Sequence, residues 1–201
     1  MNNRDVDAVI RLGKLVLEFS RIDRATAMED GVTPESDTDH TVMLGILACA
    51  FAEAHEPGMD LGKVAQFALV HDLVEVYAGD TNTFGIHAHL AHADKEERER
   101  IALSRIKLEF DATLPWISRT IEEYESLESS EARYIRTLDK VLPKITNVLN
   151  EAKRLRAHGG EGEFVEFCEA QVVKLRKSYA HDQEATLKLY LHLVEEVKKN
   201  L

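Results

Sequence analysis

The sequence predicts an all-α helical bundle, and three observations favour this fold class. Apolar residues recur at helical spacing along most of the 201 residues. No segment shows the alternation of apolar and polar residues that marks a half-buried strand. The chain holds only 10 Gly and 4 Pro, so long stretches lack helix breakers. Helices joined by short turns bury their apolar faces against one another, and we expect one domain spanning residues 1–201.

The first half of the chain is expected to contain three helices. Their apolar periodicity covers residues 5–20, 38–54 and 61–78. The segment between the first two holds Gly31 and Pro34 and is expected to form a loop. A polar cap for the second helix is expected among residues 36–38, and Asp60 is placed to cap the third.

The second half of the chain continues the helical pattern. Helical stretches are expected at residues 95–110, 114–126, 129–155 and 163–201. The segment 80–92 lacks a clear period and is expected to form an exposed loop. Pro143 should bend or interrupt its helix, because proline lacks the N–H that an interior helical residue donates. The glycine-rich segment 158–162 predicts a break, and a further interruption is expected near residues 180–182.

Charge and cysteine content narrow the classes of function. The 25 Lys and Arg against 36 Asp and Glu give a net charge of −11, which argues against broad binding to nucleic acid or anionic membranes. Cys49 and Cys168 lie far apart in apolar surroundings and are expected to be reduced thiols. The sequence shows no secretory signal pattern and no stretch of membrane-spanning length. We therefore expect a cytoplasmic protein.

The strongest functional signal lies near the end of the third expected helix. His71, Asp72 and Glu75 stand among apolar residues, and a spacing of four places His71 and Glu75 on one helical face. Gly79 occupies the position of a helix C-terminal glycine, so Asp80 falls just past the helix end. Ionisable side chains are rarely buried unless they are paired or bind a metal. The cluster therefore predicts a bound cation.

The dipeptide His-Asp occurs twice, and only one copy has a supporting context. The copy at residues 181–182 has little apolar support and no downstream Gly-Asp, so we expect it on a polar helix surface or in a turn. The copy at residues 71–72 is preceded by His40, about thirty residues earlier and near the start of a helix. It is followed about seventy residues later by Asp139, an acid in an apolar helical context.

The order of these residues resembles that of the HD-domain metal-dependent phosphohydrolases, which carry a His, a His-Asp pair and a distant Asp. The local strings Glu35-Ser-Asp-Thr-Asp-His40 and His71-Asp-Leu-Val-Glu-Val-Tyr-Ala-Gly-Asp80 look like the branch that contains bacterial 5′-deoxynucleotidases and their eukaryotic relatives. The resemblance covers the metal-site core at about residues 24–140. It implies that one divalent cation is bound by His40, His71, Asp72 and Asp139.

The chemistry of these donors supports the same conclusion. Two imidazoles and two carboxylates suit Mn, Co, Zn or Fe better than Ca, and Mg stays open. Such a cation would lower the pKa of a bound water and provide a nucleophile near neutral pH.

The resemblance also implies roles for residues beside the metal. Glu75 is placed to deprotonate or orient a water, and Asp80 to assist proton transfer to the leaving oxygen. Arg24 stands where the relatives place a substrate-contacting arginine whose fork can hold phosphate in two places, with Arg21 as a competing candidate. The deoxynucleotidases have a tryptophan after this arginine, whereas this chain has Ala25, so the choice between deoxyribose and ribose stays open.

Four further residues near the expected site have alternative interpretations. His87, His89 and His92 are consistent with ordinary surface residues, a second metal site, or part of a lid over the substrate. Lys140, next to Asp139, is interpreted as a solvated lysine, with neutralisation of the site as the alternative.

The expected function is a metal-dependent phosphohydrolase that converts a nucleoside 5′-monophosphate into a nucleoside and phosphate. The alternatives are a pyrophosphohydrolase or phosphodiesterase acting on a larger nucleotide, and a non-catalytic nucleotide sensor. The expected partner is a small phosphorylated substrate. The apolar residues of segment 163–201 serve the core or, in part, a homodimer.

Overall fold

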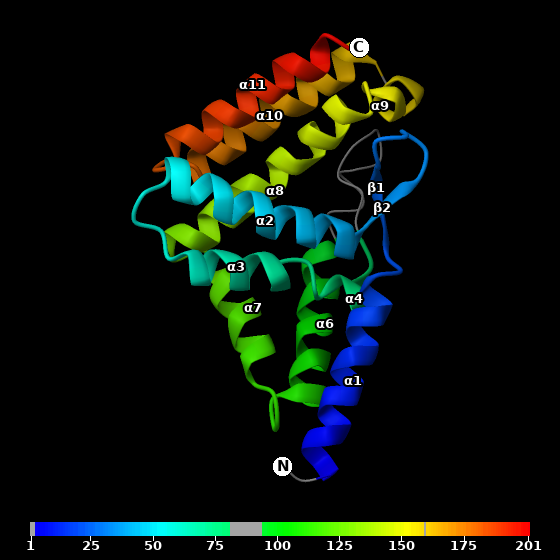
Figure 1. Cartoon of the computed structure of the whole chain (residues 1–201), viewed down its shortest axis with the longest axis vertical. Coiled ribbons are helices and arrows are strands. Elements are labelled where there is room, and N and C mark those ends of the chain that lie inside the picture. Colours follow the sequence, from blue (N-terminus) through cyan, green and yellow to red (C-terminus); the bar gives the residue numbers. More distant parts are fainter. Residues whose placement is uncertain (1–2, 81–93, 159) are drawn as a thin grey trace.

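The computed structural model describes residues 3–80, 94–158 and 160–201, and these form a helical bundle with one small hairpin (Figure 1). This confirms the all-α fold class. The helices are α1 (Asn3–Phe19), α2 (Asp37–His55), α3 (Leu61–Val70), α4 (Glu75–Ala78), α6 (Lys95–Phe110), α7 (Trp116–Ser126), α8 (Ser130–Leu149), α9 (Lys153–His158), α10 (Glu161–Ser178) and α11 (Glu184–Lys198). The strands are β1 (Asp23–Ala27) and β2 (Pro34–Ser36).

Helix α8 is the central element of the bundle. It packs against α2, α3, α7 and α11. Figure 1 shows α10 and α11 as a pair across one side of α8, whereas α1, α6 and α7 extend from the opposite side of the molecule. The hairpin lies beside the first turn of α2, and its strand β1 also contacts α8.

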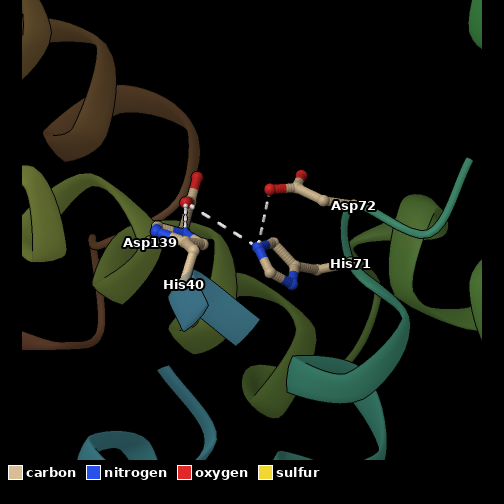
Figure 2. A group of neighbouring side chains, drawn as sticks. All are labelled: His40, His71, Asp72 and Asp139. Carbon is tan, nitrogen blue, oxygen red and sulfur yellow. Dashed lines mark hydrogen bonds and ion pairs between the residues drawn. The ribbon is translucent and has the colours of Figure 1, made fainter. Parts of the chain in front are cut away.

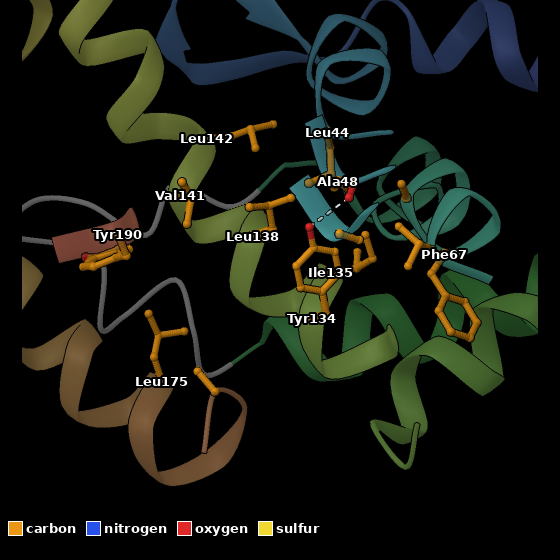
Figure 3. Close-up of a cluster of buried hydrophobic side chains, with 14 of the residues drawn as sticks. Leu44, Ala48, Phe67, Tyr134, Ile135, Leu138, Val141, Leu142, Leu175 and Tyr190 are labelled. Carbon is orange, nitrogen blue, oxygen red and sulfur yellow. Dashed lines mark hydrogen bonds between the residues drawn. The ribbon is translucent and has the colours of Figure 1, made fainter. Parts of the chain in front are cut away.

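Two hydrophobic cores result from this arrangement, and they meet at the end of α3. The larger core surrounds α8 and includes Phe67; Figure 3 shows part of it, with the Tyr134 hydroxyl donating to the Ala48 carbonyl at 2.9 Å. The smaller core is formed by residues of α1, α6 and α7 and includes Val70 and Leu73. The segment that carries His71 and Asp72 therefore runs from one core to the other.

Two helix starts agree with the polar residues expected to cap them. Ser36 caps α2, and its hydroxyl and the Asp39 side chain form a reciprocal capping box. Asp60 caps α3 by accepting hydrogen bonds from the N–H groups of Gly62 and Lys63, at 2.8 and 3.2 Å. These caps satisfy N–H groups that lack a partner within the helix.

The expected loop at residues 21–37 contains the antiparallel hairpin β1–β2, which is a correction to the sequence analysis. Its turn is held by Asp30, whose side chain accepts from the N–H groups of Val32 and Thr33 at 2.8 and 2.9 Å. Gly31 adopts a φ of 76°, which a glycine accepts without steric cost. Strands of five and three residues are too short to show an alternating pattern in the sequence.

The single helix expected at residues 61–78 is interrupted, which is a second correction. Helix α3 ends at Val70 and α4 begins at Glu75. Between them the backbone makes tighter bonds, from Leu73 N to Val70 O at 3.1 Å and from Glu75 N to Asp72 O at 2.8 Å. The His71 imidazole also donates a hydrogen bond to the Ala68 carbonyl of α3. The apolar residues that follow, Leu73 and Val74, pack in the smaller core.

The break expected at Pro143 falls later in the chain. Helix α8 runs through Pro143 and ends at Leu149. Glu151 and Ala152 then adopt φ values of 55° and 56°, which turn the chain toward α9. The other two expected breaks are confirmed, between α9 and α10 and between α10 and α11. None of the helices in the described part of the chain combines the length and apolar character needed to cross a bilayer.

Candidate metal centre

Four side chains from three parts of the chain converge at one point (Figure 2). One donor atom from each lies within 4.8 Å of the others, and the four are His40, His71, Asp72 and Asp139. The Asp139 carboxylate lies 2.9 Å from His40 Nε2 and 3.9 Å from His71 Nε2. The His71 Nε2 to Asp72 Oδ2 distance is 2.9 Å. Tertiary structure therefore brings together the residues that the spaced pattern singled out, including a pair 99 residues apart.

The bundle positions each donor by a different local feature. His40 lies in the first turn of α2, and Asp139 lies midway along α8. The residues His71 and Asp72 stand in the tightened turn where α3 leaves the larger core. His40 is 0% exposed, His71 4% and Asp139 5%, so the three are almost completely removed from water.

The tautomer of His71 fits a bound cation. Its Nδ1 lies 2.8 Å from the Ala68 carbonyl, which requires a proton on Nδ1 and, in the neutral ring, leaves a lone pair on Nε2. That buried Nε2 has no hydrogen-bond partner among the described residues, although it faces the oxygens of Asp72 and Asp139. In the neutral ring, the lone pair on His71 Nε2 thus faces carboxylate oxygens without a proton between them, and a divalent cation would satisfy these acceptors.

Glu35 is a contributor to the site that the sequence analysis missed. It is buried directly before the cap of α2, and its Oε1 lies 3.4 Å from His40 Nδ1. The hydroxyl of Thr26 in β1 donates to the same carboxylate. Burial disfavours a charged imidazole, but hydrogen bonds to Asp139 and Glu35 raise the pKa of His40 to about 9. The available signal was an acid five residues before a candidate ligand, but that spacing acquires meaning only with the hairpin.

Arg24 extends from β1 into the same centre. Its Nη1 lies 2.8 Å from Asp37 Oδ1, 2.6 Å from Asp72 Oδ2 and 4.0 Å from Glu75 Oε2. Burial opposes its charge, but the surrounding carboxylates, Asp72 first, raise the pKa of the guanidinium above its ordinary value. Arg21 is exposed at the end of α1, so Arg24 is the arginine that reaches the expected site.

A second set of acids surrounds this arginine. Glu75 is 3% exposed, and burial together with the charges of Asp72, Asp37 and Asp80 raises its pKa to about 10. Burial likewise raises the pKa of Asp37 to about 6. Asp80 is half-buried just after α4, close enough for its charge to act on both groups. Lys95 Nζ lies 4.0 Å from Glu75 Oε1.

Lys140 and two aromatic contacts complete the walls of the centre. Lys140 Nζ lies 2.5 Å from Asp139 Oδ2, so this half-buried lysine pairs with a candidate metal ligand. The Tyr124 ring meets the His71 ring edge-on at 6.4 Å, and the Arg136 guanidinium lies over Tyr124 at 4.6 Å from the ring centre. These contacts restrict rotation of the His71 imidazole.

The histidines expected to form a second metal site, a lid or a surface lie outside the described residues; these are His87, His89 and His92.

The bundle gathers two imidazoles and two carboxylates away from water. These features are typical of helical proteins that bind a divalent cation. Comparison with known proteins identifies the family. Residues 19–183 match the HD domain, and the chain belongs to the HD-domain family.

Several known proteins are similar to this chain. The 5′-deoxynucleotidase HDDC2 of Danio rerio is 28% identical over 138 residues, covering 68% of this chain and 66% of that protein. The 5′-deoxynucleotidase hdd1 of Schizosaccharomyces pombe is 28% identical over 112 residues, covering 53% of this chain and 54% of that protein. The chain thus spans slightly less than two thirds of the first of these relatives and about half of the second.

Solved structures extend the similarity over nearly the whole chain. A predicted metal-dependent phosphohydrolase from Magnetospirillum magnetotacticum MS-1 superposes with a TM-score of 0.77 at 28% identity, covering 97% of this chain and 93% of that one. A conserved hypothetical protein from Pyrococcus furiosus has a TM-score of 0.60 at 23% identity and shows the shared fold alone.

Proposed function

We propose that this protein is a metal-dependent phosphohydrolase that cleaves a nucleoside 5′-monophosphate to a nucleoside and inorganic phosphate. The observation that carries the proposal is the junction of two groups at Asp72. Its Oδ2 lies 2.9 Å from a candidate metal-ligating imidazole and 2.6 Å from the Arg24 guanidinium. A cation and an arginine fork placed side by side suit the oxygens of a phosphoryl group.

The metal would be held by His40, His71, Asp72 and Asp139. When bound, a divalent cation activates a water molecule and offsets the negative charge of the phosphoryl group. Mn, Co, Zn, Fe and Mg are the proposed candidates, because imidazole and carboxylate donors together suit these ions.

The chain's own residues supply the remaining chemistry. Arg24 binds phosphoryl oxygens through guanidinium N–H groups and orients the ester in the site. Glu75 follows His71 by four residues and has an oxygen within 4.8 Å of the Asp72 carboxylate, so its carboxylate accepts the proton of the attacking water. Asp80, just beyond α4, assists proton transfer to the leaving 5′-oxygen.

The substrate class rests on the similar proteins. Both curated relatives described above are 5′-deoxynucleotidases, and a phosphomonoester suits a centre where a four-residue donor set lies beside Arg24. Ala25 is a small residue beside the arginine, and we propose that it leaves room for ribose as well as deoxyribose.

We also propose a cytoplasmic location, a single folding unit over residues 1–201, and a homodimer. Most of the apolar residues of segment 163–201 enter the larger core, including Phe164 and Leu175. Exposed apolar residues instead gather on α1, where Ile10 and Leu17 are more than 60% exposed. Light scattering on the wild-type protein and on an Ile10→Glu, Leu17→Glu variant tests the dimer and its face.

The first experiment measures product release from a panel of ribo- and deoxyribonucleoside 5′-monophosphates. The protein is stripped of metal and reloaded separately with Mn²⁺, Co²⁺, Zn²⁺ or Mg²⁺, with the stripped protein as control. Metal-dependent release of inorganic phosphate supports the proposal. Pyrophosphate from a nucleoside triphosphate would replace it with a pyrophosphohydrolase, and nucleotide binding without any product would replace it with a sensor.

A further inference from the structure

We propose that Asp37 is a positioning residue that holds the Arg24 guanidinium in the site when Asp72 binds the metal. This inference rests on the proposed function. It concerns a carboxylate that the sequence analysis considered only as a helix cap.

The first step is that the second group of acids already surrounds a positive charge, the Arg24 guanidinium. Asp37, Asp72 and Glu75 each place one oxygen within 4.8 Å of the others, a spacing that by itself suits a cation. Arg24 Nη1 already lies 2.8, 2.6 and 4.0 Å from the three side chains. The guanidinium is therefore the positive charge that this group of acids holds.

The second step is a competition for one oxygen atom. Asp72 Oδ2 lies 2.6 Å from Arg24 Nη1 and 2.9 Å from His71 Nε2, so it belongs to both groups of side chains. A divalent cation on the donors of the first group draws on the same carboxylate and repels the guanidinium. Binding of the metal thus weakens the hold of Asp72 on Arg24.

The third step is that Asp37 is free of this competition. It belongs to the group around Arg24 and not to the His40, His71, Asp72 and Asp139 set. It is 0% exposed at the first residue of α2, where the Ser36 cap fixes the backbone. Its second oxygen, Oδ2, is buried and has no hydrogen-bond partner among the described residues, which leaves an acceptor for a further N–H of the guanidinium.

An aspartate in the first helical turn also has an ordinary structural use, because it interacts favourably with the helix dipole. The two roles differ in one measurable way. A positioning residue acts through Arg24, so its removal has little effect once Arg24 is gone. A helix-stabilising residue acts independently, so its effect persists in either background.

The kinetic experiment is a double-mutant cycle on the Mn²⁺-loaded protein with 2′-deoxyadenosine 5′-monophosphate. The variants are Asp37→Asn, Arg24→Gln and the double variant, with Glu53→Gln on the exposed side of α2 as the matched loss of one carboxylate. Loss of a charge-assisted hydrogen bond predicts about a 10- to 100-fold fall in kcat/KM for Asp37→Asn. In the Arg24→Gln background the same change is expected to alter kcat/KM by less than about twofold. The proposal would be overturned if the fold-changes in kcat/KM of the two single variants multiply in the double variant. It would also be overturned if Asp37→Asn loses its bound Mn²⁺.

A labelling experiment tests the proposal without any turnover. Phenylglyoxal modifies accessible arginines, and mass spectrometry of the peptide that contains Arg24 reports its rate of modification. We expect Mn²⁺ to leave this rate low in the wild type and to raise it severalfold in Asp37→Asn, where neither acid then holds the guanidinium. If Mn²⁺ strongly increases the rate of Arg24 modification in the wild type, Asp37 does not hold Arg24. This result is decisive even if the Asp37→Asn variant fails to fold. If the wild type releases no phosphate from any monophosphate, the proposed function fails while this measurement still decides the role of Asp37.

Discussion

The chain contains two His-Asp dipeptides with opposite fates. His71 lies where the two cores meet and is buried, with its Nε2 2.9 Å from Asp72 Oδ2. The His181 side chain is 56% exposed in the connection between α10 and α11, and its Nε2 lies 4.0 Å from Asp182 Oδ1. The same two side chains form part of a candidate metal centre in one place and a solvated surface in the other.

The neighbouring side chains and the degree of burial, and not the dipeptide itself, decide the chemistry of each His-Asp pair. At residues 71–72, α2 and α8 supply His40 and Asp139, and water is excluded, so the charges need a cation. At residues 181–182, Asp182 instead pairs with Arg133 at 2.7 Å. The side chains of His181 and Asp182 are both exposed, so solvent screens their charges.

The largest expected effect is the loss of activity in Asp72→Ala compared with Asp182→Ala. Removing Asp72 takes away a candidate metal ligand and a partner of Arg24, so we expect kcat/KM to fall by at least about 10³-fold. Asp182→Ala should stay within about twofold of wild type, because it lies on an exposed surface. Phosphate release and metal content by mass spectrometry check both variants, and equal losses in the two would break the comparison.

The two copies also differ at the position four residues after the histidine. Glu75 follows His71 at this spacing, whereas Ala185 follows His181. We expect Glu75→Gln to lower kcat by about 10²–10³-fold, because the amide is a poor proton acceptor. Bound metal should be retained, since Glu75 is outside the four-residue donor set. A wild-type rate for this variant would show that Glu75 is not the proton acceptor.

The pH dependence of stability should also distinguish the buried centre from the surface. In metal-free protein the pKa of His40 is raised to about 9 by its two acids, so protonation of His40 stabilises the fold. This contribution is complete below the unfolded pKa of about 6.5 and is lost as the pH rises through 9. Glu75, whose pKa is raised to about 10, acts in the same direction. Together the two groups are expected to lower the free energy of unfolding by about 3–7 kcal/mol between pH 6 and 9.

Urea unfolding of the metal-free protein at several pH values measures this loss. His181→Asn should keep the wild-type pH profile, because that side chain is exposed and lies outside the centre. His40→Asn should reduce the pH dependence, and the contribution of Glu75 should remain. A wild-type stability that rises from pH 6 to 9 would contradict the assignment of His40 as a protonated, acid-paired residue in the absence of metal.

The smallest expected effect concerns the surface pair itself. Asp182→Asn removes the ion pair with Arg133, and we expect the free energy of unfolding to fall by about 0.2–1 kcal/mol. Raising the salt concentration should shrink this difference, because solvent-exposed charges are screened. A loss of several kcal/mol that persists in high salt would show that the second His-Asp copy has a larger structural role than its exposure indicates.

Local sequence patterns were sufficient to predict most of the helices and the order of the candidate ligands. Apolar periodicity is a local property, so it predicted α6 at residues 95–110 and nearly the full length of α2. The cap at Asp60 was also readable, because side-chain capping depends on neighbours within a few residues. The apolar setting of residues 71–72 separated them correctly from residues 181–182.

The folded structure was needed to see the interruption after Val70, the hairpin, and the contacts of Glu35 and Asp37. Each depends on contacts between distant parts of the chain, such as the one that joins Arg24 to an aspartate 48 residues away. Local patterns show which face of a helix is buried, but they do not show which other side chains share that interior. The resemblance to a family supplied the donor set and Arg24, whereas the acids that hold His40 and Arg24 became visible when β1, α2 and α8 were packed together.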